Sequence, residues 1–242
     1  MSIHANQSVG ELVVERPHRS RIFEHLGIDY CCGGKLPLEA ACQRKGLDLA
    51  SVIELLDQSD PAEQESGSRS DPSEMGLAAL ADHIQGVHHD YLRSELPRID
   101  QLVAKVANAH GQRDPRLVSL VGVFAGLKDE MMMHMHKEEH ILFPMIRELE
   151  SGSASGASHC GSVANPIRQM ESEHDDAGNA LEQMSELTDG YQVPEMACNT
   201  HRAMLDALSY LERDMHAHVH KENNILFPRA IQLESELAQG HV

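Results

Sequence analysis

The chain has 242 residues, with 20 Lys and Arg against 38 Asp and Glu, so its formal net charge is −18. A chain this acidic repels nucleic acid and anionic membrane, which excludes both as partners. No run approaches the roughly 18 apolar residues of a membrane span, and the N-terminus shows no basic region followed by an apolar stretch. The five cysteines are irregularly spaced, so we expect no disulfide framework and a cytoplasmic location.

Residues 1–57 predict a small helical domain built from short segments. We expect one helix to end at Pro17 and the next at Gly27, because glycine is favoured just past a helix C-terminus. A third segment begins near Pro37 and ends at Gly46, and a further amphipathic segment follows it.

The loop between these segments reads DYCCGG, with Cys31 and Cys32 adjacent. Zinc sites and thioredoxin-like pairs separate their cysteines by two or more residues, and adjacent cysteines close only a strained disulfide. We expect Gly33 and Gly34 to adopt positive φ and turn backbone N–H groups toward the sulfurs, which raises the thiolate fraction. Two interpretations stay open: redox or iron-transfer chemistry, or a packing feature of a small dimerisation domain.

Residues 58–73 are polar, and we expect them to form a flexible linker. Residues 74–242 are expected to form four long helices. DPSE at 71–74 resembles a capping box that opens a helix to about Ala109, with a kink at Pro97. Further helices are expected over 114–150, 163–187 and 194–237. The pattern favours an all-α fold, an up-down-up-down four-helix bundle preceded by a small helical domain.

An internal repeat is the strongest signal in the sequence. HMHKEEHILFP at 134–144 matches HVHKENNILFP at 218–228 in eight of eleven positions. Each copy holds His-x-x-x-Glu, and four residues turn about 400° on a helix, so both side chains share one face. A further His-Asp pair precedes each copy, at 89–90 and 174–175.

If the side chains of the two repeat copies and of the two preceding His-Asp pairs point into the bundle, they supply four imidazoles and two carboxylates. The candidate ligands are His89, His134, Glu138, His174, His218 and Glu222. Mixed nitrogen and oxygen ligands suit iron or manganese, with zinc as an alternative. Six ligands exceed zinc's usual four, and carboxylates bridge metals about 3.5–4 Å apart, which favours two metals. The alternative, that the repeat preserves only packing, explains poorly why His and Glu recur at one turn of both copies.

The remaining histidines are expected to lie outside this set. His136 and His220 lie about 200° round the helix from His134 and His218. We therefore expect them to be exposed, or to contact the ligands without binding the metal themselves. The same is expected of His88. Met131 to Met133 are expected to fill the core.

The chain resembles the hemerythrin-like di-iron proteins called Repair of Iron Centers, the YtfE/ScdA group. DYCCGG is similar to the ScdA-type N-terminal domain, and HMHKEEHILFP, MESEHDDAG and HKENNILFPRA are similar to the bundle. The resemblance implies two non-haem iron ions on the six candidate ligands, bridged by carboxylates and with an oxo bridge as a further option. Oxygen-carrying hemerythrins place a fifth histidine four residues after the position of His174, where this chain has Gly178. The centre is therefore expected to have more open positions than an oxygen carrier.

The resemblance implies repair of iron–sulfur clusters damaged by nitrosative or oxidative stress, by supplying iron or handling nitric oxide. The implied partners are damaged iron–sulfur proteins, with nitric oxide or oxygen species as small ligands, and the chain itself as a homodimer. Two alternatives stay open, an oxidoreductase that reduces nitric oxide or peroxide and a sensor of oxygen, nitric oxide or iron.

Overall fold

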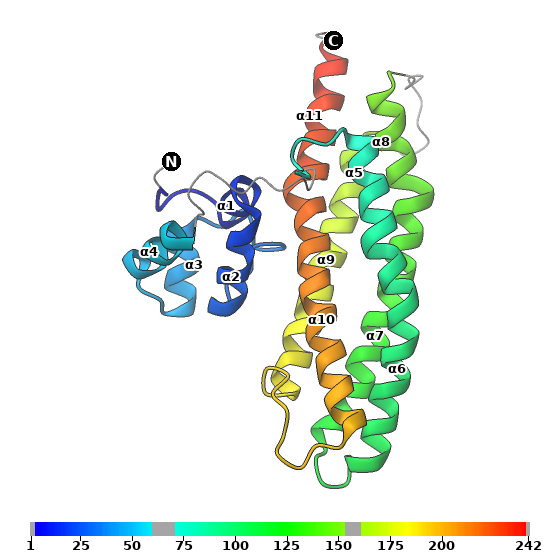
Figure 1. Cartoon of the computed structure of the whole chain (residues 1–242). Coiled ribbons are helices and arrows are strands. Elements are labelled where there is room, and N and C mark those ends of the chain that lie inside the picture. Colours follow the sequence, from blue (N-terminus) through cyan, green and yellow to red (C-terminus); the bar gives the residue numbers. More distant parts are fainter. Residues whose placement is uncertain (1–2, 60–70, 153–160, 241–242) are drawn as a thin grey trace. The chain divides into compact units, whose positions relative to one another are not determined.

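The computed structural model describes residues 3–59, 71–152 and 161–240, and within these ranges it contains helices and no strand (Figure 1). The all-α prediction is confirmed. The chain divides into two compact units, Met1–Leu80 with His216–Val242, and Ala81–Met215. The described residues do not include 60–70, which make up most of the predicted linker. They also do not include 153–160, the part of the predicted loop that holds Cys160.

Short helices form the N-terminal part of the first unit. They are α1 (Val9–Glu15), a 3₁₀ turn (Pro17–Arg19), α2 (Ser20–Leu26), α3 (Leu38–Lys45) and α4 (Leu49–Ser59). A capping box starts α1, since Ser8 accepts a bond from the Glu11 amide while the Glu11 side chain accepts one from the Ser8 amide. Gly27 and Gly46 end α2 and α3 with φ of 65° and 67°, which confirms both predicted ends.

These helices are too short to be stable in isolation, so packing holds them together. Leu12, Phe23, Leu38 and Leu56 are fully buried in one apolar cluster drawn from all four helices. Residues 3–56 therefore carry a hydrophobic core of their own.

Longer helices follow. They are α5 (Leu77–Ile84), a π-helix (Gln85–His89), α6 (Asp90–His110), α7 (Arg116–Lys137), a π-helix (Glu138–Leu142), α8 (Phe143–Glu150), α9 (Ala164–Leu187), α10 (Asn199–Lys221), a π-helix (Glu222–Leu226) and α11 (Phe227–Ala238).

Within the second unit, α6 and α7 pack against each other, and α7 packs against α9 (Figure 1). The α7–α9 pair is antiparallel, because Arg116 bonds Asp189 at one end while the His134 and His174 rings meet at the other.

The α6–α10 pair is antiparallel as well. His88 bonds Asp214 at 2.9 Å, and the rings of His110 and His201 stack near the opposite ends. Four neighbouring antiparallel helices make the predicted up-down-up-down bundle.

Two predicted helix starts are wrong. Asp71 accepts bonds from the backbone and hydroxyl of Ser73 in a turn, and the helix begins only at Leu77. Pro194 likewise lies in a turn that Ala197 closes, and α10 begins at Asn199. In both places a local turn satisfies the backbone groups that a helix start would have used.

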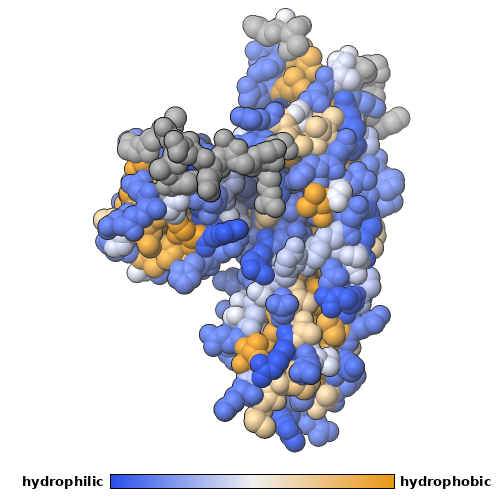
Figure 2. Space-filling model, in the orientation of Figure 1, coloured by the Kyte–Doolittle hydropathy of each residue, from blue (hydrophilic) through white to orange (hydrophobic). Residues whose placement is uncertain are grey.

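The face shown in Figure 2 is largely hydrophilic, with separate apolar spots. Met131 is buried as expected, but Met132 and Met133 are 42% and 61% exposed, so the expectation that all three fill the core is wrong for these two. None of the described helices combines the length and apolar character that a membrane crossing requires.

Candidate metal centre

The His-x-x-x-Glu spacing puts its two side chains on one helix face, as predicted. His134 Nε2 lies 3.3 Å from Glu138 Oε2, and His218 Nε2 lies 3.0 Å from Glu222 Oε1. Both glutamates are wholly buried, and each is the first residue of a π-helix. A π-helix widens the helical turn and is common at functional sites.

In the second unit two imidazoles lie against one carboxylate, and a third imidazole contacts one of them. His89 Nε2 and His134 Nε2 each lie 3.3 Å from Glu138 Oε2. His174 Nε2 lies 3.0 Å from His134 Nε2, and all four side chains are at most 1% exposed. The structure therefore brings together the four predicted ligands that belong to this unit.

The other ring nitrogen of two of these histidines meets a carboxylate. His89 Nδ1 lies 2.7 Å from Glu139, which Arg93 also bonds. A carboxylate that accepts the Nδ1 proton fixes the tautomer, so the lone pair at Nε2 faces Glu138.

His134 repeats this arrangement with a carboxylate from α9. Its Nδ1 lies 2.9 Å from Glu173, which also accepts bonds from Lys137 and Gln169. The bond from His134 is the main reason that the pKa of Glu173 falls to about 2, against the opposing effect of burial. Burial also opposes ionisation of Glu139, yet the bonds from Arg93 and His89 lower the pKa of that carboxyl.

The donor set fits a metal cation. With their Nδ1 protons given to carboxylates, the neutral rings of His89 and His134 direct lone pairs toward the buried carboxylate of Glu138. Lone pairs and a carboxylate in contact repel one another in a low-dielectric interior unless positive charge lies between them. Two imidazole nitrogens and a carboxylate oxygen are ligands that iron, manganese and zinc accept.

The first unit contains the remaining two predicted ligands. His218 and Glu222 are both fully buried and lie in contact across the junction of α10 and the following π-helix. The second copy of the repeat thus has the same local geometry as the first.

The other histidines separate into exposed and buried groups. His136 and His140 are exposed, and His140 Nδ1 bonds the carbonyl of its own helix. His88 is buried against Asp214, and His220 is buried with its Nδ1 3.4 Å from the Tyr30 carbonyl. Burial lowers the pKa of His220 to about 4. His220 is therefore a neutral packing residue of the first unit rather than an exposed one.

The DYCCGG loop differs from the expectation. The backbone N–H groups of Cys31, Cys32 and Gly33 donate to the carboxylate of Asp29, at 2.9, 3.0 and 2.7 Å, and not to the sulfurs. The Cys31 thiol is 4% exposed, and its pKa is raised by its contact with the Cys32 thiol and by burial. The loop therefore holds Cys31 as a thiol and does not activate it as a thiolate.

The glycine at position 34 allows a close approach between the loop and Asn224, and neither glycine is needed for a positive φ. Neither Gly33 nor Gly34 has positive φ. A Cβ atom on Gly34 would lie 2.4 Å from Asn224 Oδ1, and one on Gly10 would meet the same atom at the same distance. Asn224 Nδ2 donates to the Cys31 carbonyl at 3.2 Å, so the loop is seated against residues just past Glu222.

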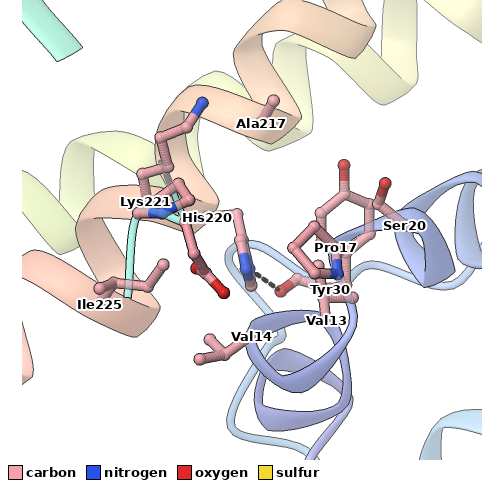
Figure 3. Close-up of a pocket in the computed structure, with 11 residues that line it drawn as sticks. Val13, Val14, Pro17, Ser20, Tyr30, Ala217, His220, Lys221 and Ile225 are labelled. Carbon is pink, nitrogen blue, oxygen red and sulfur yellow. Dashed lines mark hydrogen bonds between the residues drawn. The ribbon is translucent and has the colours of Figure 1, made fainter. Parts of the chain in front are cut away.

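A hollow of about 110 Å³ opens beside this contact, also within the first unit (Figure 3). Its lining is mainly apolar, and His220 reaches the Tyr30 carbonyl across it. None of the six predicted metal ligands lines it.

The sequence reasoning missed Glu139, Glu173 and Asn224. A signal existed for each of them. Glu139 follows the candidate ligand Glu138 and Glu173 precedes the candidate ligand His174, and carboxylates next to ligand positions can orient the ligands. Asn224 stands where the first copy of the repeat has His140, a mismatch that marks a different contact.

The antiparallel bundle and its buried His and Glu side chains define a hemerythrin-like, cation-binding class of protein. The family model for the hemerythrin HHE cation binding domain matches residues 80–230. A second model, ScdA_N, described as a domain of unknown function, matches residues 5–60.

Similar proteins narrow the class further. The chain is 38% identical over 231 residues to the iron-sulfur cluster repair protein YtfE of Pectobacterium atrosepticum, covering 96% of this chain and 99% of that one. It is 37% identical over 227 residues to a probable iron-sulfur cluster repair protein of Haemophilus influenzae, covering 94% and 97%. The chain belongs to the YtfE/ScdA family of hemerythrin-like proteins.

Proposed function

We propose that this chain binds two iron ions through His89, His134, Glu138, His174, His218 and Glu222 and uses them to repair damaged iron–sulfur clusters. The observation that carries the proposal is that two imidazoles lie 3.3 Å from the buried carboxylate of Glu138, with a third imidazole in contact with one of them. The second copy of the motif, His218 with Glu222, supports a matching contribution. The names of the relatives support the repair function.

The side chains around the centre suit a site that keeps its ligands oriented while the metal exchanges. Glu139 and Glu173 hold the histidine rings, and Arg93 and Lys137 hold those carboxylates. Bound there, iron would supply ligand exchange and one-electron chemistry. The fixed rings would not need to reorganise when a small ligand or the iron leaves.

Two finer points belong to the proposal. The first is that the centre supplies iron to, or removes nitric oxide from, a damaged cluster. The second is that the damaged cluster belongs to another protein, which acts as the partner under nitrosative or oxidative stress. The absence of a histidine four residues after His174 supports open positions for such exchange.

The experiment mixes the iron-loaded protein with a cluster enzyme that nitric oxide has inactivated and follows iron transfer and recovered activity. We expect recovery with the wild type and with His136→Ala, whose side chain is exposed, and loss of recovery with His134→Ala. Steady consumption of nitric oxide without recovery of the enzyme would favour the oxidoreductase alternative. Reversible ligand binding without either activity would favour the sensor.

A further inference from the structure

We propose that Asp29, Cys31 and Cys32 form a second metal site, in the N-terminal part of the chain, for a thiophilic divalent cation such as Fe²⁺ or Zn²⁺. Each of the three side chains offers a ligand atom, and the three atoms lie within 4.8 Å of one another. The site uses none of the bundle's six proposed ligands and stands whether or not the bundle binds iron.

The distance between the sulfurs fits a shared metal. Cys31 Sγ and Cys32 Sγ are 3.8 Å apart. Two thiolates on one tetrahedral ion, each at about 2.3 Å, are separated by about 3.8 Å. A disulfide requires about 2.0 Å, and adjacent cysteines reach that only with strain. The loop therefore presents its sulfurs at the spacing of metal ligands.

Asp29 lies in the position of a third ligand. Its Oδ1 is 3.2 Å from Cys31 Sγ, a few tenths of an ångström shorter than the roughly 3.5 Å that tetrahedral geometry gives for sulfur and oxygen. A carboxylate has about four acceptor positions. Oδ1 accepts the N–H groups of Cys31 and Cys32 and the Cys31 thiol proton, and Oδ2 accepts the N–H group of Gly33. A cation takes the place of that proton, and both thiols release their protons to solvent.

Hydrogen bonds within the protein already hold the candidate ligands of this loop in place. The bonds from Cys31, Cys32 and Gly33 fix the carboxylate, and Asn224 holds the Cys31 carbonyl from the other side. Ligands that are already placed lose little conformational entropy on binding.

The site is closed on one side and open on the other. Cys31 is buried, Cys32 is half-buried and Asp29 is exposed. Three protein ligands leave a fourth coordination position for solvent or for a ligand from another molecule, as in zinc sites that react rather than only stabilise a fold. The structure therefore suits a cation that is exchanged and not permanently enclosed.

Burial of Cys31 argues against a redox pair. It is 4% exposed, so the disulfide of another molecule has little access to its sulfur. A divalent cation brings the positive charge that allows two thiolates and a carboxylate to lie together.

The test uses Co²⁺ as the probe on the full-length protein. Thiolate-to-cobalt charge-transfer absorption reports only thiolate ligands, so Co²⁺ bound by His and Glu in the bundle does not contribute to it. We expect one thiolate-bound Co²⁺ per chain in the wild type and in Cys42→Ser. Cys42 is a buried thiol of the same unit that lies outside the cluster.

The variants Cys32→Ser and Asp29→Asn separate ligation from folding. Cys32 is half-buried and serine is close to it in size, so we expect an unchanged circular dichroism spectrum and at least tenfold weaker Co²⁺ binding at the thiolate band. Asp29→Asn should weaken binding in the same way. The proposal is wrong if the wild type shows no thiolate band, or if the band persists at full strength in the folded Cys32→Ser variant.

Discussion

At the scale of single residues, the centre depends on which nitrogen of each histidine faces inward. His89 and His134 each give Nδ1 to a carboxylate, and this leaves Nε2 for the interior. Spacing in the sequence predicts the candidate ligand positions, but the ring orientation comes from residues outside that spacing, Glu139 and Glu173. The outer carboxylates are therefore part of the proposed centre.

Glu173→Gln should weaken iron binding about 10–100-fold, because a neutral amide holds the His134 ring less firmly and lowers its basicity. Competition with a coloured chelator measures the affinity. Glu182→Gln, an exposed carboxylate on the same helix, is the matched control and should bind iron as the wild type does. Equal affinities for the two variants would contradict the orienting role.

His136→Ala and His220→Ala should both retain the iron content of the wild type, because neither ring belongs to the ligand face. They should differ in stability. His136 is exposed, whereas loss of His220 leaves its buried contact with the Tyr30 carbonyl unfilled and costs about 1–3 kcal/mol. Urea unfolding and metal analysis of both variants check this, and loss of iron from His136→Ala would show that the face assignment is wrong.

At the scale of elements, the sequence predicts those features that local chemistry decides. Helix ends at Gly27 and Gly46 follow from the left-handed backbone that glycine tolerates, and both are found. The four long helices follow from apolar periodicity.

Features that depend on contacts between distant segments could not be predicted. The π-helices at Glu138 and Glu222 each add a residue to a turn, which leaves no mark in composition. The role of Gly34 depends on Asn224, which is 190 residues away in the chain. The predicted capping box at 71–74 is not found, because the Asp71 side chain accepts the backbone N–H of Ser73 in a local turn.

Gly34→Ala should destabilise the first unit, because the new methyl group would lie 2.4 Å from Asn224 Oδ1 and 2.7 Å from the Tyr30 carbonyl. We expect a loss of about 1–3 kcal/mol in the free energy of unfolding, as for other overpacked sites. Gly122→Ala on α7 is the control. It meets nothing within 4 Å and should stabilise its helix by about 0.5–1 kcal/mol. Chemical unfolding of both variants tests the contrast, and a neutral Gly34→Ala would mean that the loop is not seated on Asn224.

At the scale of the whole molecule, the chain combines a small helical part that has its own core with a bundle that carries the proposed metal ligands. Deletion of residues 1–57 should leave the full iron content, because none of the six proposed ligands lies in that segment, although it removes the contacts of Tyr30 and Cys31 with His220 and Asn224 and should lower stability. It should impair cluster repair, since it removes Cys31 and Cys32. Circular dichroism, iron analysis and the repair assay together measure this outcome. Repair at the wild-type rate would confine the function to the bundle.

The central claim is that six residues of this chain hold two irons, and iron analysis of purified variants tests it most directly. We predict two irons per chain in the wild type and in Glu130→Ala, a control at an exposed carboxylate of α7. Glu138→Ala and Glu222→Ala should each hold one iron or none, because each removes a buried carboxylate that compensates the charge of the cations. Two irons per chain in both of those variants would contradict the account.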